Sequence, residues 1–358
     1  MRVAIACGGT GGHLFPGLAT AMALRKRGHT VALWISGRDV EAHVLKVWDG
    51  EVVAVRASAS SADLSARSLL AIPRLAAACV RSFFIMRRKR PDVLLAMGSY
   101  ASVGPVVAAW ACRIPVVLHE ANAVPGRAIS FLARFATAIA LTFPSAARRL
   151  GRHTHVVTGL PLRAALRPGA RRPGDAGDVF HVLVMGGSQG AHRLNEIATE
   201  ALCRLHGGGA PVKVIHLAGL QDESMVRERY AASGVPATVY GFLDNMALAY
   251  GHADFVVARA GAASCMELAV CALPALLVPL PSAVRDHQTA NAKAMEEAGA
   301  ADLLAQTELT AERLAAYLDA CRRDPSKLAR MSRQAKAVAI TDAAERLADL
   351  LESSRREA

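Results

Sequence analysis

The sequence predicts an α/β fold made of two doubly wound parallel-sheet domains, and three features support this prediction. Short apolar runs alternate with longer amphipathic segments along the chain, which is typical of βα units on a parallel sheet. At 358 residues the chain is too long for one ordinary hydrophobic core. The alternation stops once, in PLRAALRPGARRPGDAGD (161–178), where Pro, Gly and Arg replace the periodic apolar residues.

We therefore expect a first domain over 1–160, a linker over 161–178, a second domain over 179–340, and a charged terminal helix over 341–358 that packs back on the first domain. Ligands of such Rossmann-like sheets bind outside the carboxyl ends of the strands, so the two domains are expected to face a common cleft. The expected strands, in chain order, are RVAIAC (2–7), TVALWIS (30–36), DVLLAMG (92–98), IPVVLHE (114–120), TAIALTF (137–143), HVVTG (155–159), FHVLVMGG (180–187), VKVIHLAG (212–219), ATVYGF (237–242), DFVVARAG (254–261) and PALLVPL (274–280).

The composition limits the classes of partner. Lys and Arg number 42 against 30 Asp and Glu, a net charge of +12, which favours anionic partners such as phosphates or an anionic membrane surface. Aromatic residues make up only 5% and do not interleave with basic ones, so we expect no nucleic-acid partner. The seven scattered cysteines form no CxxC pair and predict buried thiols in a reducing compartment. With no signal-peptide pattern and no apolar stretch of about 18 residues, we expect a cytoplasmic protein.

Each half begins with a strand, a glycine-rich turn and a helix. The first turn contains Gly8, Gly9, Gly11 and Gly12, and the second contains Gly186, Gly187 and Gly190. Such a turn either holds an anion at the helix N-terminus or simply lets the strand turn into the helix. Neither turn is followed by the Lys of a Walker motif, and neither fits a dinucleotide fingerprint.

A third strand-to-helix junction, ARAGAASCMELA (258–269), leaves two interpretations open. Ser264 and Glu267 have the spacing of a capping box, in which Glu267 would cap its own helix. Alternatively, the Glu267 carboxylate accepts hydrogen bonds from two adjacent hydroxyls, such as those of a ribose.

Eight sequence blocks together resemble glycosyltransferase family 28, a family of inverting enzymes with the GT-B fold. They follow the family order over nearly the whole chain and read GGTGGHLFPGLA (8–19), MGSYASVGP (97–105), IPVVLHEANAVPG (114–126), TGLPLR (158–163), GGSQGAHRLN (186–195), GFLDNMALAY (241–250), ARAGAASCMELA (258–269) and DHQTANA (286–292). The resemblance implies transfer of N-acetylglucosamine from UDP-N-acetylglucosamine to the C4 hydroxyl of the N-acetylmuramyl sugar of lipid I. The product would be lipid II, made for peptidoglycan at the cytoplasmic face of the bacterial inner membrane.

By the same resemblance, the second domain holds the donor and the first holds lipid I. The implied donor-binding residues are Arg163, Ser188, Gln189, Phe242, Leu243, Arg259, Glu267 and Gln288, with His287 beside Gln288. The implied acceptor-binding residues are Thr10, Gly11, Gly12, Ser99, Tyr100, His119, Glu120 and Asn122. Three positions depart from the family pattern: Ser99 replaces a glycine, Leu160 an asparagine and Ala121 a glutamine.

Glycosyl transfer needs a base for the attacking hydroxyl and stabilisation of the departing UDP. His13, at the loop-to-helix junction with an expected pKa near neutrality, is the candidate base; it could instead bind the acceptor diphosphate or cap the helix. The chain has no Asp-x-Asp and no metal-ligand spacing, so we expect no tightly bound cofactor or metal. Helix N-termini, Ser188 and Arg259 would stabilise the diphosphate, with loosely held Mg²⁺ still compatible.

Three other classes compete with a glycosyltransferase. A sugar-nucleotide epimerase on the same fold would need no lipid acceptor. A nicotinamide oxidoreductase should have an acidic residue at the end of the second strand, where Arg38 and Asp39 are ambiguous. A non-enzymatic scaffold would bind without turnover.

The segment ARSLLAIPRLAAACVRSFFIMRRKRPD (66–92) joins apolar residues to a basic end. Much of its apolar content is what a helix covering a sheet needs. Phe83 to Met86, however, form a longer apolar run than one helix stripe buries, and Arg87 to Arg90 follow directly. The segment is therefore also a candidate for peripheral attachment to an anionic membrane.

Overall fold

The computed structural model describes residues 1–37, 47–55, 71–162, 166, 179–186 and 191–355. The chain divides into two compact units, Met1–Arg163 with Ile340–Ala358, and Ala164–Ala339. The division falls in the segment expected to be a linker, of which only residues 161, 162 and 166 are described.

The first unit contains a seven-stranded sheet in the order β3-β2-β1-β4-β5-β6-β7, with every neighbouring pair parallel. Its strands are β1 (Arg2–Ala6), β2 (Thr30–Ile35), β3 (Glu51–Ala54), β4 (Val93–Ala96), β5 (Val116–Glu120), β6 (Ala138–Leu141) and β7 (His155–Val157). All residues of β4, β5 and β6 are buried, because helices cover both faces of the sheet. The strand β3 lies outside the runs that the sequence predicted.

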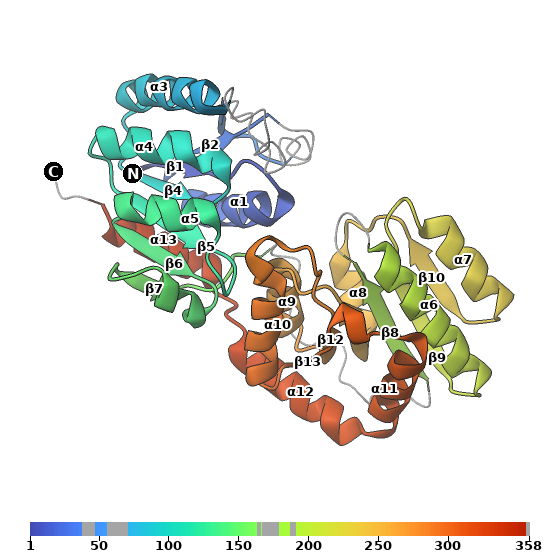
Figure 1. Ribbon diagram of the computed structural model, residues 1–358. Helices are drawn as coiled ribbons and strands as arrows, with labels where there is room; N and C mark the ends of the chain where they lie inside the picture. Colours follow the sequence, from blue (N-terminus) through green and yellow to red (C-terminus); the bar gives the residue numbers. More distant parts are fainter. Residues whose placement is uncertain (38–46, 56–70, 163–165, 167–178, 187–190, 356–358) are drawn as a thin grey trace. The chain divides into compact units, whose positions relative to one another are not determined.

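Two layers of helices enclose this sheet (Figure 1). The helices are α1 (Gly11–Lys26), α3 (Ala71–Lys89), α4 (Val103–Ala111), α5 (Arg127–Leu132) and α13 (Ala343–Ser353). Leu14 and Leu24 of α1 share one apolar cluster with Leu347 and Leu351 of α13, so the terminal helix packs on the first unit. On the opposite face, α3, α4 and α5 form another cluster around β1, β4 and β5.

The second unit repeats the architecture with a six-stranded parallel sheet in the order β10-β9-β8-β11-β12-β13. Its strands are β8 (Phe180–Met185), β9 (Val212–Leu217), β10 (Ala237–Tyr240), β11 (Phe255–Ala258), β12 (Ala275–Leu277) and β13 (Ala301–Leu303). Its helices are α6 (His192–Gly207), α7 (Glu223–Ala232), α8 (Met246–His252), α9 (Ala262–Val270), α10 (His287–Glu297), α11 (Ala311–Arg323) and α12 (Pro325–Val338). The sequence did not predict β13.

All seven cysteines are free thiols: Cys7, Cys265, Cys271 and Cys321 are buried, and the other three are partly buried. None of the described helices combines the length and apolar character that crossing a bilayer requires.

Candidate active site

Two loops meet at the carboxyl ends of β1 and β4, which are neighbours in the first sheet. The hydroxyl of Ser99, after β4, donates a 2.8 Å hydrogen bond to the carbonyl of Gly8, after β1. Gly9 has a φ of +128°, and a Cβ built there would lie 2.9 Å from Ser99 Oγ. Both the backbone conformation and the close approach therefore require glycine at this position.

Ser99 itself occupies a conformation that favours glycine, with a φ of +64°. The family resemblance leads us to expect glycine at this position, where this chain has serine. Besides its bond to Gly8, the Ser99 hydroxyl accepts a 3.1 Å hydrogen bond from Ala101 N and so caps the short 3-10 helix Tyr100–Ser102. With a ψ of 164°, this conformation costs a non-glycine residue about 1–3 kcal/mol, which the two hydrogen bonds oppose. Tyr100, next in the loop, packs partly buried against the core.

His13 lies in the first turn of α1, between these two loops. Its Nδ1 shares a 2.9 Å hydrogen bond with Thr10 Oγ1, so the Thr10 side chain does not cap the helix. A Cβ at Gly98 would lie 3.2 Å from His13 Nε2, which places the other edge of the ring against the loop after β4. Because the ring bonds the Thr10 hydroxyl, the capping interpretation of His13 is not supported.

The pKa of His13 is lowered to about 4, mainly because burial disfavours the imidazolium and also because His119 is close. The residue as a whole is partly buried. This corrects the near-neutral pKa expected from the sequence. His13 is therefore an unprotonated hydrogen-bonding group at physiological pH in the unliganded unit.

The first turn of α1 offers further donors beside His13. Gly11 and Gly12 are the first two helical residues, and that turn contains no acidic side chain. The first N–H groups of a helix have no intrahelical acceptor and carry a partial positive charge. This helix end is therefore suited to an anion.

His119 lies at the carboxyl end of β5 and is only 1% exposed. Its Nε2 donates a 3.0 Å hydrogen bond to the carbonyl of Gly159, while its Nδ1 is buried with no partner among the described residues. Burial lowers its pKa to about 4. The side chain is thus a neutral imidazole inside the first unit, not an exposed one.

The neighbouring Glu120 is 3% exposed and organises the loop that follows β5. Its Oε1 accepts hydrogen bonds from Asn122 N at 2.8 Å and from Asn122 Nδ2 at 3.2 Å, and its Oε2 accepts one from Gly126 N at 2.8 Å. Burial raises the pKa of Glu120, while these donors act in the opposite direction. The Glu120 carboxylate thus bonds Asn122 and the backbone of its own loop.

In the second unit, Glu267 lies in the middle of α9. Because α9 begins at Ala262 with Gly261 as its N-cap, the capping-box interpretation of Ser264 and Glu267 is wrong. Glu267 Oε2 instead accepts a 2.7 Å hydrogen bond from the hydroxyl of Tyr250, which is 3% exposed. Glu267 itself is partly exposed.

Arg259 follows β11 and is 6% exposed, with its guanidinium turned inward. Its Nη1 donates to the carbonyls of Val278 and Pro279, both at 3.1 Å, and its Nη2 donates to Gln306 Oε1 at 2.5 Å. Burial lowers its pKa from the usual arginine value. Arg259 thereby fixes the segment that follows β12.

The segment held by Arg259 leads to Gln288. The next residue, Leu280, donates its backbone N–H to Gln288 Oε1 at 2.9 Å, near the start of α10. His287 Nδ1 is 2.7 Å from the carbonyl of Val284. A continuous set of contacts therefore connects Arg259, the 278–280 segment and Gln288.

The remaining candidates are either exposed or not described. Phe242 is 57% exposed and Leu243 is partly buried, in the turn between β10 and α8. Arg163, Ser188 and Gln189 lie outside the described residues. Among the residues that are described, no three His, Cys, Asp or Glu side chains gather as metal ligands would.

Sequence reasoning missed three groups that position the candidates. They are Tyr250, which bonds Glu267; Gln306, which bonds Arg259; and Gly159, whose carbonyl holds His119. Tyr250 and Gly159 fall within blocks that carried the family resemblance, but Gln306 lies outside every block and no sequence pattern marks it.

Two family descriptions match the chain along most of its length. The glycosyltransferase family 28 N-terminal domain matches residues 3–141, and the glycosyltransferase family 28 C-terminal domain matches residues 181–347.

Full-length relatives agree with this assignment. A Syntrophotalea carbinolica protein, 40% identical with 97% of each chain covered, is named UDP-N-acetylglucosamine–N-acetylmuramyl-(pentapeptide) pyrophosphoryl-undecaprenol N-acetylglucosamine transferase. A Geobacter sp. M21 protein of the same name is 35% identical, covering 100% of this chain and 97% of its own. The crystal structure of Acinetobacter baumannii MurG superimposes with a TM-score of 0.82 at 30% identity, covering 98% of this chain and 99% of the other.

A more distant likeness concerns the fold alone. A putative UDP-N-acetylglucosamine 2-epimerase from Listeria monocytogenes has a TM-score of 0.74 at 15% identity, covering 98% of this chain and 96% of its own. The fold is therefore shared by enzymes that differ in chemistry. Two matched family domains and full-length relatives with up to 40% identity nevertheless decide the family: the chain belongs to glycosyltransferase family 28.

Proposed function

We propose that this chain transfers N-acetylglucosamine from UDP-N-acetylglucosamine to the C4 hydroxyl of the N-acetylmuramyl sugar of lipid I, with inversion, and so makes lipid II for peptidoglycan. The observation that carries the proposal is 40% identity, over 97% of each chain, to a protein named as that transferase. The epimerase alternative has weaker support, because the epimerase likeness is one of fold at 15% identity.

On the acceptor side, the proposal assigns the lipid I diphosphate to the two loops of the first unit. The supporting geometry is the uncapped N-terminus of α1 at Gly11 and Gly12, beside Thr10 and the Ser99 loop. Glu120 then acts as a positioning residue, since its carboxylate already accepts the donors of its own loop, including Asn122.

His13 is the proposed base that accepts the proton of the C4 hydroxyl. Its low pKa keeps the imidazole unprotonated and able to accept a proton, although a base with a pKa near 4 has a weak driving force. A bound diphosphate would raise that pKa, because a nearby negative charge favours the imidazolium. Binding of the acceptor would thus make His13 a better base.

On the donor side, the proposal assigns Glu267 to the ribose hydroxyls and the backbone around Phe242 and Leu243 to the uracil edge. Gln288 would bind the sugar, and Arg259 would hold the 278–280 segment that positions Gln288. Arg163, Ser188 and Gln189 complete the proposed set around the UDP phosphates. The departing diphosphate is stabilised by helix N-termini and these polar groups, and the proposal requires no tightly bound metal.

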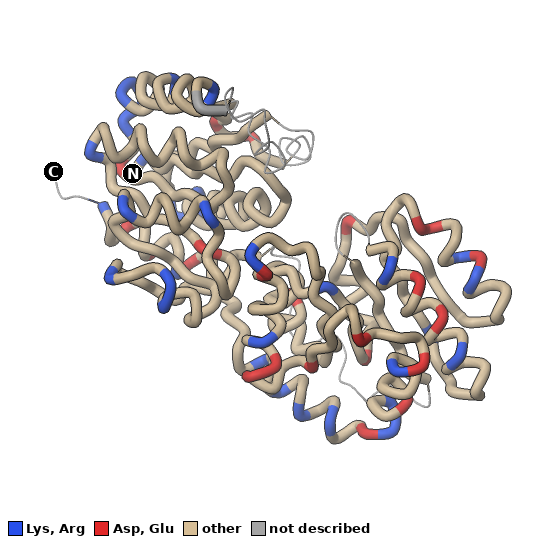
Figure 2. The backbone as a smooth tube through the Cα atoms, viewed as in Figure 1, with Lys and Arg blue, Asp and Glu red and all other residues tan. Residues whose placement is uncertain are grey.

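The proposal includes peripheral attachment to the cytoplasmic face of the inner membrane through α3. Val80 is 56% exposed and Phe84 66%, one helical turn apart. Basic residues Arg87, Arg88 and Lys89 end the helix, and Figure 2 shows this basic end. Met86 is 0% exposed and Phe83 packs on the core, so the apolar edge is narrower than the run Phe83 to Met86 suggested.

Acceptor dependence tests the activity. The chain is incubated with UDP-N-acetylglucosamine, with and without a soluble lipid I analogue, and UDP is measured. Release only in the presence of the analogue supports transfer. Isomerisation of the donor sugar without acceptor would instead establish an epimerase, and donor binding with no turnover would establish a scaffold.

Sedimentation with phosphatidylglycerol vesicles tests the attachment. Replacing Val80 and Phe84 with Ser and Arg81 and Arg87 with Gln should abolish vesicle binding and leave a folded chain. The matched control replaces the exposed Arg330 and Arg333 of α12 with Gln, and should bind like wild type. Equal binding by the α3 variant and wild type would place the attachment elsewhere.

A further inference from the structure

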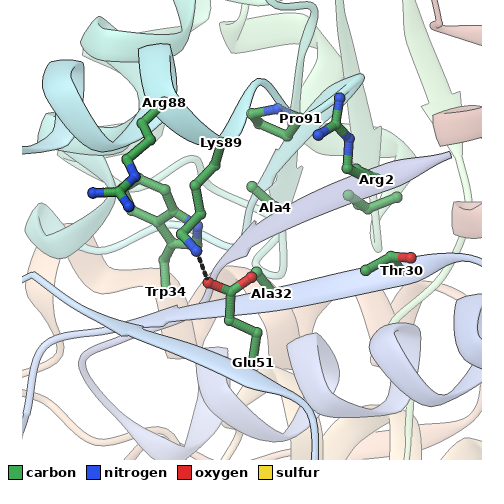
Figure 3. Close-up of a pocket in the computed structure, with 10 residues that line it drawn as sticks. Arg2, Ala4, Thr30, Ala32, Trp34, Glu51, Arg88, Lys89 and Pro91 are labelled. Atoms are coloured by element: carbon green, nitrogen blue, oxygen red, sulfur yellow. Dashed lines mark ion pairs between the residues drawn. The ribbon is translucent and has the colours of Figure 1, made fainter.

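A cavity of about 250 Å³ lies at the amino ends of β1, β2 and β3, beneath the carboxyl end of α3 (Figure 3). Its walls include the first residues of all three strands: Arg2, Thr30 and Glu51. The candidate active-site loops follow the carboxyl ends of β1 and β4, at the opposite edge of the sheet. The cavity is therefore separate from the site already described.

The floor of the cavity is apolar and hollow because small residues lie side by side across the sheet. Ala4 of β1 pairs with Ala32 of β2, and Ala32 pairs with Glu51 of β3. Trp34, 2% exposed, forms another part of the lining. Its indole N–H donates no hydrogen bond to any of the described residues.

The rim of the cavity is cationic. Arg2, Arg88 and Lys89 line it together with one carboxylate, Glu51, which forms an ion pair with Lys89 (Figure 3). Within the described part of the chain, the guanidinium groups of Arg2 and Arg88 make no ion pair or hydrogen bond. The carboxylate of Asp92 is nearby, but it accepts the backbone N–H of Arg2 at 2.6 Å. The rim thus has two guanidinium groups that are not engaged by other described residues, one on each side of the Lys89–Glu51 ion pair (Figure 3).

We propose that this cavity binds the phosphate of an anionic membrane lipid, with a cationic side chain of the rim bonding the phosphate oxygens and the adjoining glycerol on the alanine floor. Its volume is somewhat below that of pockets for drug-sized ligands, which suits a headgroup. The choice of a lipid rests on the proposed attachment through α3, because Arg88 and Lys89 belong both to the cavity and to the basic end of that helix. The cavity would add selectivity for the headgroup to the general attraction of α3.

Charge and shape can be altered separately to test the proposal. Arg88→Gln should weaken binding to phosphatidylglycerol vesicles about five-fold, the effect expected for one cation near an anionic surface. Glu51→Gln removes the competing carboxylate and should tighten binding. Arg330→Gln and Glu200→Gln make the same changes in net charge on exposed helices of the second unit, and should have much smaller effects. Equal effects of each cavity variant and its control would overturn the proposal.

Ala32→Leu fills the floor without changing charge. In the folded full-length chain, as judged by its thermal melt, it should abolish saturable binding of glycerol 3-phosphate, followed by tryptophan fluorescence or calorimetry. It should also reduce the extra affinity for phosphatidylglycerol over phosphatidylcholine vesicles. If Ala32→Leu binds glycerol 3-phosphate and phosphatidylglycerol vesicles like wild type, the cavity site is refuted. If Ala32→Leu does not fold, the Glu51→Gln variant, which preserves the shape of the cavity, tests the site by itself.

Two further arms separate the sources of phosphate and the two proposals. Inorganic phosphate should compete with vesicle binding more weakly than glycerol 3-phosphate does. The lipid assignment would be refuted if the two compounds competed equally and the cavity variants kept the wild-type preference for phosphatidylglycerol over phosphatidylcholine vesicles. The Val80/Phe84/Arg81/Arg87 variant should lose vesicle binding and still bind glycerol 3-phosphate. If it binds vesicles normally, the attachment through α3 fails while the phosphate site is judged by the soluble probe.

Discussion

Replacement of Glu267 by Ala should weaken donor binding with a modest effect on folding. In the proposed complex the carboxylate accepts hydrogen bonds from two ribose hydroxyls, and loss of such contacts costs about 1–3 kcal/mol, or roughly 5- to 150-fold in affinity. The structure adds a second consequence, because the same carboxylate accepts the hydroxyl of Tyr250 at 2.7 Å. A loss of affinity in Glu267→Ala alone would therefore not separate direct contact from positioning.

Tyr250→Phe provides the matched control, since it removes the hydrogen bond and leaves Glu267 in place. Calorimetric titration with UDP should show a loss in Tyr250→Phe that is clearly smaller than in Glu267→Ala. Glu267→Gln, which keeps an acceptor for Tyr250, should still lose affinity because the charge is gone. Wild-type affinity in Glu267→Ala would refute the ribose contact, and equal losses in Glu267→Ala and Tyr250→Phe would reduce Glu267 to a positioning residue.

Three further predictions concern the first unit. His13→Ala should lower kcat roughly 10²- to 10⁴-fold with little change in acceptor KM, and a change confined to KM would make His13 a phosphate ligand. Gly98→Ala should lower kcat more than the control Gly28→Ala in steady-state assays. Both glycines have positive φ, but a Cβ at Gly98 would lie 3.2 Å from His13 Nε2, whereas a Cβ at Gly28 would have no atom within 4 Å. Equal effects of the two substitutions would argue against the contact between Gly98 and His13. Burial holds the pKa of His119 at about 4 in the folded chain, against 6.5 in the unfolded chain. Between pH 6.5 and pH 4 the unfolded chain therefore binds more protons, and the free energy of unfolding falls as the pH drops through this range. His119→Gln should reduce that slope in chemical denaturation, and an unchanged slope would contradict it.

The sequence predicted the fold well where strands are long and buried. The four residues of β4 and the five of β5 are all buried, so their runs are continuously apolar and easy to find. The missed strands, β3 and β13, lie at sheet edges, have four and three residues, and include the charged Glu51 and Asp302. Their pairing with a neighbour, not their own pattern, makes them strands.

The candidate residues were found by type and position, but not by orientation. Arg259 follows β11 as expected, yet only the fold shows that its guanidinium turns inward to Val278 and Pro279. Glu120 likewise follows a strand end, but its partners are amides of its own loop. Long-range packing also sets the low pKa of His13, since burial is its main cause. These features depend on neighbours distant in sequence, which local patterns do not reveal.

The linkage formed in the product tests inverting transfer to lipid I most directly. After reaction with UDP-N-acetylglucosamine, which carries its sugar in the α configuration, the lipid I analogue is isolated and examined by mass spectrometry and by the anomeric proton coupling. The account predicts one added N-acetylhexosamine residue, β-linked to the C4 oxygen of the N-acetylmuramyl sugar. An α-linked product, or an unmodified acceptor beside an isomerised donor, would contradict it.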